Sequence, residues 1–140
     1  MLSMDLFRNF AGKIRADHDK RGIPHDRIDQ VIALDEQWRA ALKEMEEGRR
    51  ERNLAARGIA DAKKSGNKEE ADRIMAQVKD LGERIAALDE KANGLLSERD
   101  AIRMRIPNLL HSEVPQGDDE AGNTQHSLHG VKPELSLIHI

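Results

Sequence analysis

The sequence contains no cysteine and no tyrosine, and aromatic residues make up only 2% of its 140 residues. Without cysteine the chain has no disulfide, no thiol nucleophile and no thiolate metal site, which fits a reducing compartment. One tryptophan and two phenylalanines cannot form a row of rings on which single-stranded bases stack. Any bound nucleic acid should therefore be recognised through its backbone and shape.

Long apolar runs are also missing. No stretch approaches the roughly 18 consecutive apolar residues of a membrane-spanning helix, and no signal peptide opens the chain. We therefore expect a cytoplasmic protein with no membrane partner. Charged residues make up 35% and hydrophobic residues 38%, a balance typical of an extended helical protein rather than a globule with a thick core.

Apolar residues recur at alternating steps of three and four, which is typical of a coiled coil. The first half of this seam is Val31, Leu34, Trp38, Ala41, Met45, Gly48, Arg52, Ala55, Ile59 and Ala62. The second half is Ala71, Ile74, Val78, Leu81, Ile85, Leu88, Ala92, Leu95, Arg99, Ile102 and Ile106. The pattern predicts two long helices, over residues 27–64 and 68–106.

The residues between the two halves predict a tight turn. Gly66 suits the left-handed residue that ends a helix, and Asn67 with Glu70 forms a capping box that opens the next. So short a loop makes the helices antiparallel neighbours, and facing residues should have numbers that sum to about 132 or 133. The first helix contains a column of small residues, Ala41, Gly48, Ala55 and Ala62. This column should face isoleucine and leucine residues of the second helix.

A short amphipathic helix is expected near residues 4–21, ended by Gly22, with one apolar face made of Leu6, Phe7, Phe10 and Ile14. We expect that face to dock at the base of the long helices, on Ile28, Val31, Ile102 and Ile106. Asp26 is the predicted N-cap of the first long helix. Pro107 should end the second.

The predicted fold class is all-α: a long antiparallel two-helix coiled-coil hairpin with a short N-terminal helix packed at its base. We assign residues 1–106 to this helical domain, with the hairpin over 27–106 and its tip at about 64–68. Residues 107–134 are expected to be a linker. Residues 135–140 resemble a translated sequencing adapter, so we expect the native protein to continue past about Glu134 with a further domain.

The distal half of the hairpin is basic, although the whole chain carries a net charge of −3. Five acidic residues in this stretch leave it with a net charge of +4, the footprint expected of a segment that meets phosphates. Solvated coiled-coil flanks also show such blocks. The nine basic residues that could contact phosphates of a nucleic acid are Arg49, Arg50, Arg52, Arg57, Lys63, Lys64, Lys68, Arg73 and Lys79.

Arg52 and Arg99 occupy seam positions. Their stems are expected to cover the seam while the guanidinium groups reach solvent or a nearby carboxylate. For Arg52 the alternative is a polar contact that helps fix the register of the helices or meets a phosphate. Trp38 is expected to pack near the base. His126 and His129 could suggest a metal site, and the acidic run Asp118-Asp119-Glu120 a cation site. No third histidine ligand shares a predictable element with these residues, so we expect no metal site.

Residues 106–123 fill every spaced position of the pattern I-P-N-x-x-H-x-x-V-P-x-G-x-x-E-x-x-N. They read Ile106-Pro107-Asn108-Leu109-Leu110-His111-Ser112-Glu113-Val114-Pro115-Gln116-Gly117-Asp118-Asp119-Glu120-Ala121-Gly122-Asn123. This stretch resembles the segment that follows the tRNA-binding arm of seryl-tRNA synthetases. The same family's order continues upstream in Lys20-Arg21-Gly22, Leu34-Asp35-Glu36, Glu51-Arg52-Asn53 and Ala62-Lys63-Lys64. Ala56-Arg57 and Gly48 depart from the usual family residues. Gly48 costs about 1 kcal/mol relative to alanine, for which close helix approach should compensate.

The resemblance implies a class II enzyme, a serine-tRNA ligase, that joins serine to tRNA with ATP and Mg²⁺, and that forms a homodimer through a catalytic domain absent here. It also implies that the arm recognises the long variable arm of serine tRNA. We find no glycine-rich phosphate loop in this chain and no nucleophile paired with a base, so we expect the chain alone to hold no cofactor and to be inactive.

Two other functions are compatible with the seam. One is a structural or chaperone-like hairpin that grips a protein partner. The other is a partner-binding module that resembles synthetase arms but has lost the catalytic domain. The linker pattern and the basic tip favour the tRNA-binding arm, because a protein-gripping tip would more often be apolar.

Overall fold

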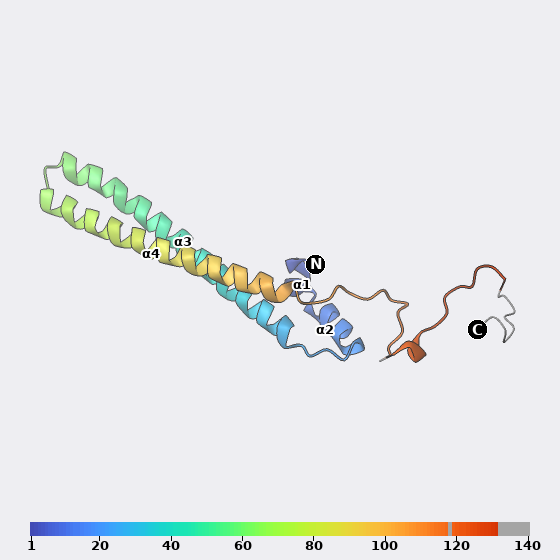
Figure 1. Cartoon of the computed structure of the whole chain (residues 1–140). Helices are drawn as coiled ribbons and strands as arrows, with labels where there is room; N and C mark the ends of the chain where they lie inside the picture. Colours follow the sequence, from blue (N-terminus) through green and yellow to red (C-terminus); the bar gives the residue numbers. More distant parts are fainter. Residues whose placement is uncertain (118, 132–140) are drawn as a thin grey trace.

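The computed structural model describes residues 1–117 and 119–131 of the chain, and its main feature is a helical hairpin (Figure 1). Helix α3 (Asp26–Lys64) runs outward for 39 residues, about 58 Å at 1.5 Å per residue. Helix α4 (Lys68–Arg103) returns alongside it. The predicted fold class is confirmed. The predicted adapter segment 135–140 lies outside the described residues.

The tip of the hairpin is a Schellman turn. The amide of Asn67 donates to the carbonyl of Ala62 at 3.0 Å, and Gly66 has the predicted left-handed backbone with φ of +74°. Asn67 caps α4 by accepting from the amide of Glu70 at 3.2 Å. The carboxylate of Glu70 accepts from Arg73 at 2.8 Å. Glu70 therefore makes an ion pair where the capping box predicted a bond back to the cap residue.

The predicted register is confirmed by two glycines of α3. A Cβ added at Gly48 would lie 3.3 Å from Cγ1 of Ile85, and one added at Gly58 would lie 3.4 Å from Cδ1 of Ile74. Both pairs fit the expected sum of about 132 or 133. The absence of a side chain at Gly48 thus allows the close approach that the sequence analysis expected.

The sequence predicted that the column of small residues in α3 faces large residues throughout, and this prediction is wrong at two levels of the seam. By the same register Ala41 lies opposite Ala92 and Ala62 opposite Ala71, and all four are at most 8% exposed. Small residues therefore meet small residues at two levels of the seam, which brings the helix backbones close there as well.

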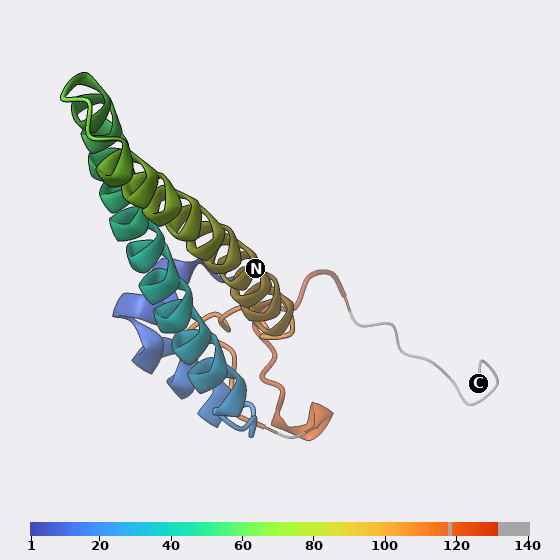
Figure 2. The ribbon, with the colours of Figure 1, turned by 90° about the vertical axis from the view of Figure 1, so that its left-hand side faces the viewer.

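The N-terminal segment differs from the single helix that was predicted. It forms α1 (Met4–Asn9) and α2 (Ala11–Lys20), separated at Phe10, whose φ of −135° and ψ of 30° are not helical. Phe10, predicted on the apolar face, is 48% exposed. The other predicted contacts with the base are confirmed, since one core cluster contains Leu2, Phe7, Ile14, Ile28, Val31 and Ile106, with Leu6 and Ile102 packed against it. Figure 2 shows α1 and α2 beside the lower part of α3.

Two helix ends are displaced from their predicted positions. The N-cap of α3 is His25, and Asp26 is instead the first helical residue, where its charge lies near the positive end of the helix dipole. Helix α4 ends at Arg103, three residues before the predicted end. A turn follows, in which the amide of Ile106 donates to the carbonyl of Arg103 at 3.1 Å, so that Ile106 reaches the base core.

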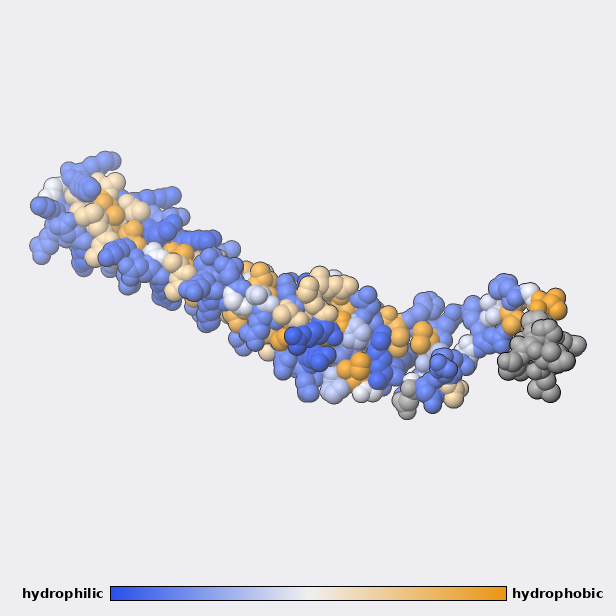
Figure 3. All heavy atoms as spheres, viewed as in Figure 1, coloured by the Kyte–Doolittle hydropathy of each residue, from blue (hydrophilic) through white to orange (hydrophobic). Residues whose placement is uncertain are grey.

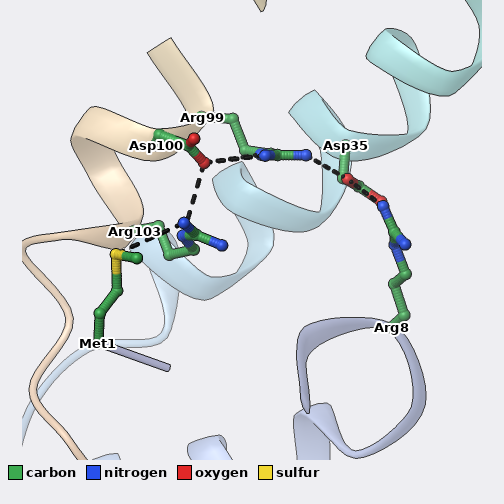
Figure 4. A network of polar contacts seen from close by, with 6 residues as sticks. All are labelled: Met1, Arg8, Asp35, Arg99, Asp100 and Arg103. Carbon is green, nitrogen blue, oxygen red and sulfur yellow. Dashed lines mark hydrogen bonds and ion pairs between the residues drawn. The ribbon is translucent and has the colours of Figure 1, made fainter. Parts of the chain in front are cut away.

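The buried carboxylate of Asp35 joins helices α1, α3 and α4 at the base of the hairpin (Figure 4). Asp35 accepts from Nε of Arg8 at 2.7 Å and from Nη1 of Arg99 at 2.7 Å. Arg99 continues the network to Asp100 at 2.9 Å, and its guanidinium lies 5.1 Å from the ring centroid of Trp38. The predicted carboxylate partner of Arg99 therefore exists, but the guanidinium is buried, because only 6% of the side chain is exposed.

Beyond Pro107 the described chain is irregular except for the short 3₁₀ helix η1 (Glu120–Gly122). The linker first crosses the C-terminal end of α2. There the amide of Leu110 donates to Asp17 Oδ1 at 2.6 Å, and Nη2 of Arg21 donates to the carbonyl of Asn108 at 2.6 Å. Within the described part of the chain, no helix is long and apolar enough to cross a membrane.

Candidate nucleic-acid interface

Eight of the nine predicted RNA-binding residues are exposed, and only Arg52 is half-buried in the seam. Exposure alone does not make an interface, because a straight RNA stem can touch only one side of a rod. The basic side chains that share one side of the hairpin can be found from their positions relative to the seam. Seam residues such as Met45 and Gly48 are buried and therefore mark the side of α3 that faces α4.

Helix α3 carries a column of basic residues on the face opposite the seam. Four exposed side chains recur every seven residues, which is about 10.5 Å along the helix: Lys43, Arg50, Arg57 and Lys64. A step of seven residues returns to nearly the same side of a helix. These four charges therefore form a nearly straight line along the outer face of the hairpin.

A second group of basic residues flanks this column. Arg49 and Lys63 directly precede Arg50 and Lys64, and the side chain of Lys68 joins them from α4. Lys63 and Lys68 line a groove of about 250 Å³ at the tip, together with Gly66, Ala71, Asp72 and Met75. The column and this flank make one continuous basic side, defined by Lys43, Arg49, Arg50, Arg57, Lys63, Lys64 and Lys68.

Three predicted residues are not members of the basic side as defined here. Arg52 lies in the seam, and Arg73 pairs with Glu70 at 2.8 Å. Lys79 lies on α4, outside the α3 column, in an exposed pair with Glu83 at 3.9 Å. The opposite flank of the hairpin and the outer face of α4 carry exposed acidic residues, including Glu51, Asp61, Glu69, Asp80, Glu83 and Glu90. The face of the arm in Figure 3 is hydrophilic over most of its length, with small apolar patches between the charged residues. The basic side and these acidic residues therefore lie on different sides of the hairpin, although the acidic flank also carries exposed Arg73, Arg84 and Lys91.

Lys43 is not among the predicted residues, because it precedes Arg49, the first residue of the predicted basic stretch. Its signal was present in the sequence, because the spacing of seven from Lys43 to Lys64 matches the heptad of the seam. Its contribution is reduced by Glu47, whose carboxylate lies 4.0 Å from the Lys43 ammonium group in an exposed pair.

In the part of the chain that is described, no three histidine, aspartate or glutamate side chains lie close enough to hold a metal ion. Asp119 instead caps η1, accepting from the amide of Ala121 at 2.9 Å. Asp118, part of the acidic run considered from the sequence, lies outside the described residues.

With this geometry in place, comparisons with known proteins identify the family. The family model described as Seryl-tRNA synthetase N-terminal domain matches residues 1–110. The chain belongs to this family. A serine-tRNA ligase of Staphylococcus saprophyticus is 36% identical over 125 residues, which is 89% of this chain and 29% of that protein.

Solved structures give the same family. A seryl-tRNA synthetase from Pyrococcus horikoshii, complexed with ATP, has a TM-score of 0.81 and 32% identity over 86% of this chain and 27% of its own. A cytoplasmic serine-tRNA ligase from Naegleria fowleri, in complex with AMP, has the same TM-score at 20% identity, over 98% of this chain and 37% of its own, and shows the shared fold. This chain thus spans 27% to 37% of the length of these three synthetases.

The matched family domain extends beyond the last helix. It ends at residue 110, whose amide is bonded to Asp17 in α2. In this chain the seryl-tRNA synthetase N-terminal domain therefore includes the start of the linker as well as the hairpin and the two short helices.

Proposed function

We propose that this chain is the tRNA-binding arm of a seryl-tRNA synthetase, and that its basic side binds the long variable arm of serine tRNA. The observation that carries the proposal is the column of four basic residues on the outer face of α3, in a chain of this family. A double-stranded RNA stem presents regularly spaced phosphates and 2′-hydroxyls, which a rigid rod with a line of positive charges complements.

The rest of such an enzyme would ligate serine to the tRNA with ATP and Mg²⁺, would be cytoplasmic, and would dimerise through its catalytic domain. The residues described here do not fit ATP or Mg²⁺. They contain no cluster that could hold the ion. A groove of about 380 Å³ on the hairpin is lined by Glu51 and Asp80, whose carboxylates would repel a triphosphate. We therefore propose that this chain supplies RNA binding and no chemistry.

The experiment is a titration of the chain against serine tRNA and against the same tRNA with its variable arm deleted. The parent chain should bind the intact tRNA more tightly. The triple variant Arg50→Ala, Arg57→Ala, Lys64→Ala should lose about tenfold or more in affinity for the intact tRNA, because each lost phosphate contact removes a favourable release of counterions.

The matched control is Arg73→Ala, Arg84→Ala, Lys91→Ala, which removes the same net charge from exposed positions on the acidic flank. It should lose little affinity. Equal binding of the two RNAs, or equal losses in the two triple variants, would contradict the proposal.

A protein-gripping hairpin is the second candidate, and the exposed side chain of Leu54, 60% accessible on the distal arm, is the observation that favours it. Failure of the chain to distinguish the two RNAs would favour this second candidate.

A further inference from the structure

The start of the linker is held at both ends against the base of the hairpin. At one end Ile106 is 4% exposed within the base core. At the other end the amide of Leu110 donates to Asp17 Oδ1 at 2.6 Å. Between them the carbonyl of Asn108 accepts from Nη2 of Arg21 at 2.6 Å. Segment 106–110 is therefore anchored at three points over five residues.

Asp17 is a specific anchor because it is a buried carboxylate with both oxygens engaged. Only 6% of its side chain is exposed. Oδ1 accepts from the amide of Leu110, and Oδ2 accepts from Nε of Arg21 at 2.9 Å. A buried carboxylate is stable only when it is paired and hydrogen-bonded. Displacing the linker would remove one of these bonds.

Arg21 serves both partners at once. Its planar guanidinium donates from Nε to Asp17 and from Nη2 to the carbonyl of Asn108, so one rigid group bridges α2 and the linker. Arg21 follows the last residue of α2, and Gly22 next to it turns the chain away with φ of +64°. The turn leaves the guanidinium facing the linker.

These are the hydrogen bonds that join the chain after Pro107 to the helices, as far as the described residues extend. From His111 onward the bonds are local, such as that from the amide of Val114 to the carbonyl of His111 at 3.1 Å. The direction in which the chain leaves the hairpin is therefore set by α2, through Asp17 and Arg21, as well as by the end of α4.

We propose that Asp17 and Arg21 form a latch that holds residues 107–110 on α2 and fixes the direction of the linker relative to the arm. They are positioning residues. If the proposed function is right, the latch sets where an RNA held on the basic side lies relative to the domain that follows in the longer relatives.

The absence of cysteine makes the latch directly measurable. Spin labels are attached at Ala87→Cys on α4 and Ser112→Cys on the linker, both exposed positions, and their distance distribution is recorded by electron double resonance. The parent chain should give one narrow distribution. Arg21→Ala should broaden it. Asp17→Ala should broaden it further, because it removes the Leu110 anchor and also the carboxylate that orients Arg21 toward Asn108. Arg15→Ala is the matched control, since Arg15 lies in α2 but pairs with exposed Asp29.

Amide hydrogen exchange is the second readout. Exchange at Leu110 should accelerate about tenfold or more in Asp17→Ala while exchange within α3 stays unchanged. If the loss of buried Asp17 unfolds the base, Arg21→Ala decides, because Arg21 lies at the surface. A parent chain with a broad distance distribution, or variants that match Arg15→Ala, would overturn the latch. Neither readout uses RNA, so failure of the arm to bind tRNA leaves this test intact.

Discussion

At the scale of single residues, Asp35 is the most consequential side chain of the base. It lies on α3, is 2% exposed, and accepts hydrogen bonds from Arg8 of the N-terminal segment and Arg99 of α4. Helices α1, α3 and α4 each contribute one charged group. The side chains of Asp35 and Arg99 are 4% and 6% exposed, whereas that of Arg8 is 38% exposed. Removing one member of such a group leaves another buried charge without its partner.

We therefore expect Asp35→Asn to lower the free energy of unfolding by about 3 kcal/mol, mainly because the buried guanidinium of Arg99 loses its partner across the seam. Urea unfolding measures this. Asp29→Asn is the control on the same helix, because its carboxylate is 59% exposed and pairs with Arg15, a contact expected to contribute about 0 to 1 kcal/mol. Similar losses in both variants would show that burial of Asp35 does not matter.

The same residue predicts a pH dependence. The hydrogen bond from Arg8, with a smaller contribution from Arg99, lowers the pKa of Asp35 below its usual value of 3.8. The unfolded chain therefore binds this proton more readily than the folded chain. The stability that Asp35 contributes should be fully present above about pH 4 and disappear as the pH falls through the lowered pKa. Parent and Asp35→Asn should converge in stability at acid pH, and a constant difference down to pH 2 would contradict this.

At the scale of elements, the two long helices were predictable because a seam of three- and four-residue steps determines helix length, partner and register together. The turn was predictable because Gly66 and Asn67 each have a local conformational role. The break at Phe10 was not, since the spacing of Leu6, Phe7, Phe10 and Ile14 fits a continuous helix. The interruption depends on how Phe7 and Ile14 reach one core, which is tertiary packing.

The charged side of the arm was predicted in part for the same reason. A charge count along the sequence located the basic region but could not tell which residues share a side. The pairing of Arg73 with Glu70 follows from helical neighbours, and the burial of Arg99 depends on Asp35, 64 residues away. The Asp17–Arg21 contacts with the linker span about 90 residues and had no local signal.

The glycines of the hairpin give a prediction about helix contact. A Cβ at Gly94 would meet no atom within 4 Å, whereas one at Gly48 would lie 3.3 Å from Ile85. Gly94→Ala should raise the free energy of unfolding by about 0.5 to 1 kcal/mol, through helix propensity alone. Gly48→Ala should gain clearly less, because Ile85 must move. Thermal unfolding of both variants checks this, and an equal gain would mean that the helices are not in close contact at Gly48.

At the scale of the whole molecule, the proposed division of labour gives a prediction about activity. If the chain supplies RNA binding alone, as proposed, the purified chain should catalyse no serine-dependent exchange of pyrophosphate into ATP. A protein extended to the length of the matched synthetases is the positive control in the same assay. Exchange above background with the chain alone would show that it contains a catalytic site.

The basic side of the hairpin predicts how its RNA affinity responds to salt. Each phosphate contact releases counterions, so the slope of log K against log salt counts the contacts. Removing Arg50, Arg57 and Lys64 should lower the magnitude of that slope by about two to three, since somewhat less than one is lost per contact. Removing Arg73, Arg84 and Lys91 changes the net charge equally but leaves the basic side intact, and should leave the slope nearly unchanged. If both variants lower it equally, binding depends on net charge alone, and the line of charges on α3 has no special role.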